Sequence, residues 1–439
     1  MTKLRRTLFI AVSFSLLFTP NAYAATFSPK VVPPFFSTTI SGNQNDEIIG
    51  ITSTKKNWIV AGNVVGDFLG TTPLGPLGPL GGVDSWVSAF DSSGGNVWSL
   101  RVGTSEDDVA TAIAVDSKEQ IWIAGLAQSA ENPPTLLSPD SSSASAESQP
   151  IESNQTPTVQ TLNPDTVTAQ SVKPIRKDLK FVTVTQVDKS GVLLNRFAIA
   201  LSNFGYVTAI IPGSAVVYLI GIEITKTGGE RSFMQSLTSA GEFGTKFYFG
   251  KSATTLASGV LNKDKTLTLV GHSAEVLAKK PVIGKVDGII LNVSPTDGKI
   301  LKSVRSNGVG ATRAWKSAAG NLTVGGTSVT KILTEAVISQ FSSTGSVLWS
   351  KRYAGATAAV NTSSVVAVLT TQTNALLKAK AGDVVVYQFD KKGEPILGVF
   401  GGRIPLSAEI LGLRSQSGLG TCVATRAADG TFVLTQLPF

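Results

Sequence analysis

A short turn sequence recurs along the chain, and it restricts the possible fold more than any other feature. Each copy ends one apolar run, passes through Asp, Ser, Thr or Lys to a glycine, and begins another apolar run. Asp, Ser and Thr can bond the backbone in a turn, and glycine readily adopts the positive φ that closes a hairpin. After a longer first interval the copies return about every 50 residues, which indicates a repeat architecture. They lie at residues 90–94, 187–191, 237–241, 293–298, 341–345 and 389–393.

A second recurrent unit lies between these turns. Its clearest copy has apolar runs at 109–115 and 121–125, and it ends at Gly125. Short apolar or alternating runs bounded by turn residues are typical of strands. We name the four strands of one repeat a, b, c and d, so that this unit supplies a–b and the recurrent turn joins c to d. Other copies of the a–b unit end at Gly62, Gly221, Gly271 and Gly326.

Seven a–b units but only six c–d turns predict that the two ends of the chain meet. Residues 431–436 are expected to form strand c of the last repeat, and residues 35–41 its strand d. A ring of sheets closed in this way leaves no unpaired seam. The sequence therefore predicts an all-β, seven-bladed β-propeller over residues 25–439, with the N-terminal strand closing the last blade.

The first repeats resemble a known family, the bacterial SBBP-type β-propeller repeat. The resemblance is good over residues 41–125, recognisable near 334–355 and weak elsewhere. It implies a propeller in an exported or surface protein and implies no particular activity. The stretches that carry it are Gly103-Thr104-Ser105-Glu106-Asp107-Asp108, Ile113-Ala114-Val115-Asp116, Ile121-Trp122-Ile123-Ala124-Gly125, Gly66-Asp67-Phe68 and Gly82-Val83-Asp84-Ser85-Trp86.

Residues 1–24 have the pattern of a secretory signal peptide. A basic start precedes an apolar run, and Ala22-Tyr23-Ala24 is a small-residue cleavage site. Sec export is favoured, and Arg5-Arg6 leaves twin-arginine export as the alternative. Removing three basic residues takes the formal charge from +8 to +5, without clusters, so no nucleic-acid partner is expected. The mature protein is expected to be a secreted, extracellular or envelope-associated monomer without a transmembrane segment.

One cysteine, Cys422, and one histidine, His272, limit the cofactor chemistry. They cannot form an internal disulfide, a Cys/His zinc site or a haem-attachment motif. Cys422 is expected to be buried in the last b strand, and His272 to lie at a loop edge. Trp98 and Trp349 are expected to dock between blades rather than to hold a quinone. No cofactor is therefore predicted.

All the irregular sequence is predicted to fall on one face of the propeller. The proline-rich segment 66–82 and the disordered Ser/Pro/Thr-rich insertion 127–178 are both b–c loops. The acidic stretches 45–47 and 106–108 are d–a crossings, which lie at the same end of the blades. Binding residues are usually carried by loops of this kind above a rigid scaffold.

Six residues at this face are candidate binding residues. The carboxylates could bind Ca²⁺ through their oxygens, although they lack the spacing of a specific calcium loop, and the alternative is that they cap turns between blades. Arg313 is expected near the channel mouth, and Trp315 in the core between blades. The candidates are Asp46, Glu47, Glu106, Asp107, Asp108 and Arg313.

The favoured function is an exported, non-enzymatic scaffold that binds a protein or a surface polysaccharide. The alternative is a propeller hydrolase or lyase with its active site at the channel mouth. Three or more carboxylates and an arginine around the channel would favour the enzyme.

Overall fold

The structure of the protein is a computed structural model that describes most of the predicted propeller. The predicted signal peptide, Asp46 and most of the insertion 127–178 lie outside the described residues. The described residues are 36–40, 47–65, 81–130, 178–331, 333–362, 365–370, 380–381, 383–403, 409–426 and 432–437.

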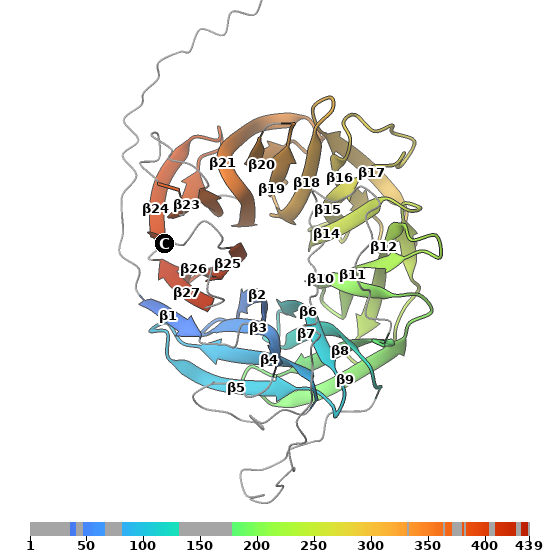
Figure 1. Cartoon of the computed structure of the whole chain (residues 1–439), viewed down its shortest axis with the longest axis vertical. Coiled ribbons are helices and arrows are strands. Elements are labelled where there is room, and N and C mark those ends of the chain that lie inside the picture. The colour runs from blue at the N-terminus through green and yellow to red at the C-terminus, as the bar shows by residue number, and fades with distance from the viewer. Residues whose placement is uncertain are drawn as a thin grey trace, which may run out of the picture.

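The described chain is built from strands arranged in a ring (Figure 1). The first sheet contains β2 (Glu47–Ser53), β3 (Trp58–Val65), β4 (Val83–Phe90) and β5 (Asn96–Val102). The second contains β6 (Asp108–Val115), β7 (Ile121–Ala127), β8 (Phe181–Val187) and β9 (Leu193–Ala200). The third contains β10 (Gly205–Pro212), β11 (Val216–Ile224), β12 (Glu230–Thr238) and β13 (Phe247–Phe249).

The rest of the ring is formed by three further sheets. The fourth contains β14 (Thr254–Leu261), β15 (Leu267–Ser273), β16 (Asp287–Val293) and β17 (Ile300–Ser306). The fifth contains β18 (Thr312–Ala318), β19 (Thr323–Val329), β20 (Thr334–Phe341), β21 (Val347–Thr362), β22 (Val365–Thr370), β23 (Asp383–Phe389) and β24 (Pro395–Arg403). The sixth contains β25 (Glu409–Gln416), β26 (Gly420–Arg426), β27 (Phe432–Leu437) and β1 (Phe36–Ile40).

Over the residues that the structure describes, the propeller has six blades, and the prediction of seven separate blades is wrong. The reason is the 16-residue strand β21, which belongs to two sets of four strands. Its residues up to Ala354 pair with β20, and its residues from Gly355 pair with β22. No crossing interrupts the strand at this point, so the two sets form one seven-stranded sheet.

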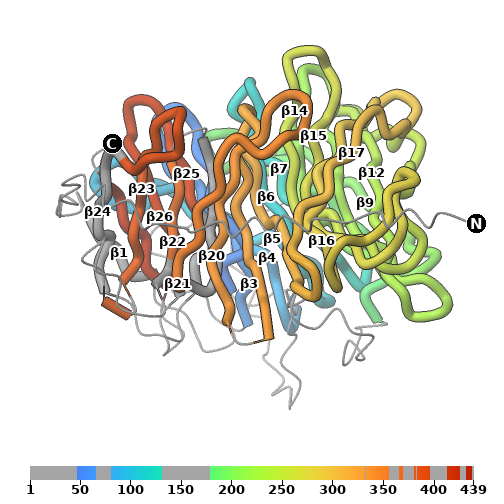
Figure 2. Tube along the Cα trace, turned by 90° about the horizontal axis from the view of Figure 1, so that it is seen from above, coloured from blue at the N-terminus to red at the C-terminus, as the bar shows by residue number. Residues whose placement is uncertain are grey.

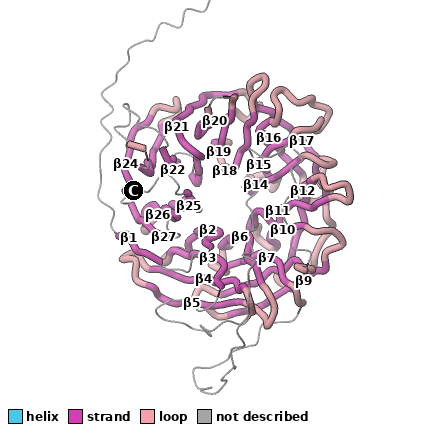
Figure 3. Tube along the Cα trace, viewed as in Figure 1, coloured by secondary structure: helices cyan, strands magenta, loops and turns pink. Residues whose placement is uncertain are grey.

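The prediction that the two ends of the chain close the ring is confirmed. Strand β1 pairs antiparallel with β27, from Phe36 opposite Gln436 to Ile40 opposite Phe432. The last blade thus takes its outer strand from the N-terminal part of the chain, as Figure 1 shows. Figure 3 shows that strands and loops account for the whole described ring.

A β-bulge recurs in the innermost strands of the blades. The register with the second strand shifts at equivalent places, for example between Ala110 and Ala112 in β6 and between Trp315 and Ser317 in β18. The glycine that ends each a–b unit pairs with the residue just before the bulge. A Cβ on these glycines would lie 1.8–2.5 Å from a backbone oxygen of the inner strand, so the approach requires glycine. They are Gly62, Gly125, Gly221, Gly271 and Gly326. The last blade has Thr425 at this place.

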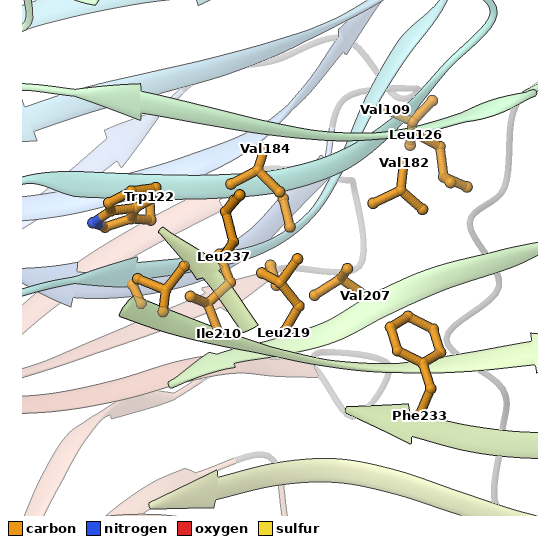
Figure 4. Packing of buried hydrophobic residues seen from close by; sticks show 14 of the residues in the cluster. Val109, Trp122, Leu126, Val182, Val184, Val207, Ile210, Leu219, Phe233 and Leu237 are labelled. Atoms are coloured by element: carbon orange, nitrogen blue, oxygen red, sulfur yellow. The ribbon is translucent and has the colours of Figure 1, made fainter. Parts of the chain in front are cut away.

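Apolar side chains fill the space between neighbouring blades. Figure 4 shows this packing between the second and third sheets, where Trp122 and Val184 face Leu219 and Leu237. All four side chains are almost fully buried. Trp98 docks between blades as predicted, since its indole N–H donates to the Lys189 carbonyl oxygen of the next blade at 3.1 Å. The Trp349 ring packs 5.5 Å from that of Phe389, which belongs to the same seven-stranded sheet, so this contact joins the two sets of four strands within one blade.

The antiparallel pairing gives the ring two different faces (Figure 2). We call the end with the a–b and c–d turns the turn face. We call the other end the loop face; it includes residues 103–107, 128–130, 201–204, 225–229, 250–253, 274–286, 307–311 and 330–331. On the turn face, the predicted turn chemistry is confirmed, since Asp91 Oδ1 accepts from the Ser93 and Gly95 amides at 2.8 and 2.9 Å, and Gly94 has a φ of 83°.

Candidate functional site

The acidic crossing before β6 contains one buried carboxylate, Asp108. The residue is 3% exposed, and its carboxylate forms an ion pair with Arg196. Oδ2 accepts from the Thr104 amide and hydroxyl, both at 2.7 Å. Burial raises the pKa of Asp108, while Arg196 and Thr104 act in the opposite direction. Asp108 therefore fixes the crossing to the second blade, and we leave it out of the binding surface.

The two preceding carboxylates, Glu106 and Asp107, are more accessible. Glu106 is exposed, and Asp107 is half-buried. Asp107 Oδ1 accepts from the Val83 amide at 2.9 Å, and the Asp107 amide donates to Gln128 Oε1 at 3.2 Å. Gln128 in turn donates to Asp178 on the far side of the insertion. The crossing thus ties together the ends of the two irregular loops and presents an acidic surface between them.

Of the first acidic crossing, the structure describes Glu47. It is half-buried at the start of β2, where its Oε2 accepts from Asn63 Nδ2 at 3.3 Å. Asn63 also bonds the next blade, because its Nδ2 donates to the Ala110 carbonyl oxygen and its Oδ1 accepts from the Ala110 amide at 2.6 Å. Glu47 thus belongs to a polar contact between blades, while Asp46 lies outside the described residues.

Arg313 lies at the start of the inner strand β18 and is almost fully buried, at 7% exposure. Nη1 donates to Ser306 Oγ at 2.7 Å, and the buried Nε has no hydrogen-bond partner within the described part of the chain. The guanidinium lies 5.5 Å from the centre of the Trp315 ring. Burial, with a smaller contribution from Arg352, lowers the pKa of Arg313 to about 10. This guanidinium is bonded to a hydroxyl rather than to a carboxylate.

The other residues singled out in the sequence are part of the core. Trp315 is 0% exposed and Cys422 is 0% exposed, which confirms both as core residues. His272 was expected at a loop edge, and this prediction is wrong. It lies inside β15, 6% exposed, because the strand continues past Gly271 to Ser273. Burial lowers the pKa of His272 to about 4, so the imidazole is neutral at pH 7.

A recurrent ion pair on the loop face was missed in the sequence. In each pair, an acidic residue near the start of the third strand of a blade forms an ion pair with an arginine on the fourth strand. In the sheet register, the arginine is paired with the residue that follows the acid by two positions. The first two pairs are buried. The pairs are Asp84–Arg101 at 2.6 Å, Asp287–Arg305 at 3.0 Å and Glu335–Arg352 at 3.3 Å. The signal was present as an acid at the start of β4, β16 and β20 and an arginine near the end of β5, of β17 and of the part of β21 that pairs with β20.

The described residues contain no group of three or more His, Cys, Asp or Glu side chains placed to hold a metal ion. Calcium binding at the acidic crossings therefore stays a prediction. Within the same described segments, no helix of sufficient length and hydropathy to span a bilayer is present.

The strand order and the closed ring define the protein as an all-β β-propeller. No protein-family model matches the chain, so the resemblance to the SBBP-type repeat gains no support from that comparison. No curated protein sequence matches it either.

Solved structures that are similar to this chain include a β-propeller domain. The β-propeller domain of the trilobed protease from Pyrococcus furiosus is 10% identical, with a TM-score of 0.43, over 89% of this chain and 95% of that chain. A prolyl endopeptidase has the same identity and TM-score, over 89% of this chain and 46% of that chain. A protein of unknown function from Bacteroides caccae is 8% identical, with a TM-score of 0.32, over 82% and 83% of the two chains. Similarity at this level carries no argument about activity.

Proposed function

We propose that the protein is an exported β-propeller scaffold that binds a protein or a surface polysaccharide on its loop face. The supporting observation is how the carboxylates of this face are arranged. Asp84, Asp108 and Asp287 are buried and each meets an arginine, whereas Glu106 lies exposed beside the ends of the irregular loops. The buried acids stabilise the scaffold, and the exposed one is available to a partner.

The surroundings of Arg313 also favour binding over hydrolysis. Asp287 and Glu335 are close enough to act on Arg313 electrostatically. However, Asp287 is bonded to Arg305 and Glu335 to Arg352. Carboxylates held in ion pairs are poor general bases, because the neighbouring cation stabilises their charged form. The alternative of a hydrolase or lyase at the channel mouth is thus less well supported by these contacts.

The proposal is tested by cross-linking from single positions. A photoreactive amino acid replaces Glu106 on the loop face, and in a matched variant it replaces the exposed Glu242 on the turn face. Each purified variant is mixed with isolated envelope protein and, separately, with isolated surface polysaccharide. We expect a discrete adduct from position 106 and none from position 242. Equal labelling from both positions, or labelling from 242 alone, would show that the loop face is not the binding face.

A further inference from the structure

We propose that a second part of the loop face attaches the protein to bilayers that contain anionic phospholipid. This part, the basic aliphatic surface, lies over the fourth sheet and the start of the fifth, and it is separate from the acidic crossing at Glu106. It goes beyond the proposed binding of a protein or polysaccharide. The surface consists of Val276, Lys279, Ile283, Lys285, Val309, Lys331 and Leu333.

Three loops bring these residues together at one end of the blades. The loop 274–286 joins β15 to β16, and residues 307–311 cross from β17 to β18. Between β19 and β20, the Thr330 amide donates to the Leu333 carbonyl oxygen at 2.9 Å. The Lys285 amide donates to the Ala311 carbonyl oxygen at 2.8 Å, which joins the first two loops. Thr312 is paired with Val329, which places the third loop beside the second.

The aliphatic residues of this surface project into solvent. Val309 is 94% exposed, Val276 66%, Ile283 46% and Leu333 38%. Val309 stands between Gly308 and Gly310, and a Cβ on either glycine would have no atom within 4 Å. Val309 therefore forms the tip of a protruding loop. Single exposed aliphatic residues are common, but four on adjoining loops form a surface that favours an apolar environment.

The charge of this surface is positive because its carboxylates are used internally. Lys279, Lys285 and Lys331 are exposed, and none of them forms a salt bridge among the described residues. Glu275, by contrast, accepts from the Lys251 and Ala253 amides at 2.8 and 3.1 Å. Asp287 and Glu335 are held by arginines, as described above. The lysines are therefore left to attract an external anionic surface.

The longest loop of the surface is held in one conformation. Leu277 is 6% exposed and anchors the loop in the apolar core beneath it. Ala278 and Lys279 follow with φ of 49° and 63°, inside a turn closed by the Lys280 amide donating to the Leu277 carbonyl oxygen at 2.9 Å. Residues other than glycine rarely adopt positive φ, and the surrounding bonds hold them there. A preorganised loop loses little conformational entropy on binding.

The shape of the surface selects a bilayer over a peptide. Peptides bind along sheet edges or in apolar grooves, where concave walls cover their side chains. Here the aliphatic residues stand at loop tips, and Val309 is almost uncovered. Loop tips of this kind can insert among lipid headgroups while the neighbouring lysines approach anionic phosphates.

The experiment is flotation of the purified full chain with lipid vesicles. Vesicles of phosphatidylcholine alone are compared with vesicles that also contain phosphatidylglycerol, at low and high salt. We expect binding to the anionic vesicles only, weakened by salt. Lys279→Gln with Lys331→Gln should weaken binding by roughly 25-fold, at about fivefold per lysine. Val309→Ser with Leu333→Ser should also weaken it, but without changing its salt dependence.

Matched controls lie on the turn face. Val347→Ser with Leu348→Ser removes two aliphatic residues that are 54% and 59% exposed, and Lys263→Gln removes an exposed lysine. These variants should bind like the wild type, and all variants should melt at the same temperature. The proposal is overturned if the wild type does not bind anionic vesicles, or if the control variants lose as much binding as the loop-face variants. It is also overturned if the chain binds a soluble acidic peptide but no vesicle. None of these results would bear on cross-linking from position 106.

Discussion

The approach of the bulged inner strand to the repeated glycine can be tested by Gly326→Ala. The added Cβ would lie 1.9 Å from the Ala314 carbonyl oxygen and 2.9 Å from the Trp315 Cα. Both are backbone atoms of the adjacent strand, so no flexible side chain can move aside. Overpacking of this kind costs about 1–3 kcal/mol. Replacing glycine also restricts the unfolded chain, which stabilises by about 0.4–1 kcal/mol where the native backbone tolerates alanine. The clash is the larger effect, so we expect net destabilisation.

The matched control is Gly320→Ala, in the turn that joins the same two strands. A Cβ there would have no atom within 4 Å. It should leave the stability unchanged or raise it slightly. Urea denaturation followed by tryptophan fluorescence compares the two variants, because Trp315 is fully buried beside the bulge. If Gly326→Ala unfolds at the same urea concentration as the wild type, the close approach does not explain the repeated glycine.

The remaining predictions concern the ion pairs, the closure, the turns and the insertion. Asp84→Asn should destabilise by about 3–5 kcal/mol in thermal or urea denaturation, because it removes the negative charge of the buried Asp84–Arg101 ion pair. A cost no greater than that of an exposed ion pair would contradict this. Deleting residues 25–42 should lower the melting temperature, because β27 loses its edge partner. The hydrogen bonds that the Asp91 carboxylate accepts lower the pKa of Asp91 in the folded protein. The carboxylate should therefore stabilise the fold above the pKa that Asp91 has in the unfolded chain, and this contribution should be lost as the pH falls through the pKa of the folded state. An Asp91→Asn variant should accordingly show a smaller loss of melting temperature in acid. Deleting residues 131–177, which leaves the bonded ends Gln128 and Asp178 in place, should leave melting nearly unchanged but reduce cross-linking from position 106.

The hairpin turns and the ring closure could be predicted because their signals are local or paired in the sequence. A polar residue followed by glycine identifies a turn wherever it occurs, and Gly94 fulfils this role through its positive φ. The closure followed from an unmatched strand at each end, and β1 with β27 confirms it. Trp315 was assigned to the core between blades from the apolar residues aligned with it in other repeats, and it is fully buried.

Features that depend on two distant strands were not predicted. The bulge opposite Gly125 appears only when the register of β6 and β7 is known. The pairing of Asp287 with Arg305 requires knowing which residues of β16 and β17 lie opposite. Asp108 was assigned to the surface because its neighbours in the sequence are acidic and accessible. In the structure, Asp108 accepts a hydrogen bond from the Thr104 hydroxyl and forms an ion pair with Arg196. No local sequence pattern indicates the contact with Arg196.

The continuous strand β21 has a consequence for how the ring comes apart. In the other sheets a crossing separates one set of four strands from the next, so each set can lose its hydrogen bonds without breaking those of its neighbour. Here one strand supplies hydrogen bonds to β20 at one end and to β22 at the other. Opening either set pulls on the same stretch of backbone, and protein segments that share such a strand tend to exchange their amide hydrogens as one cooperative unit. This seven-stranded sheet therefore behaves as a single large segment in an otherwise evenly divided ring.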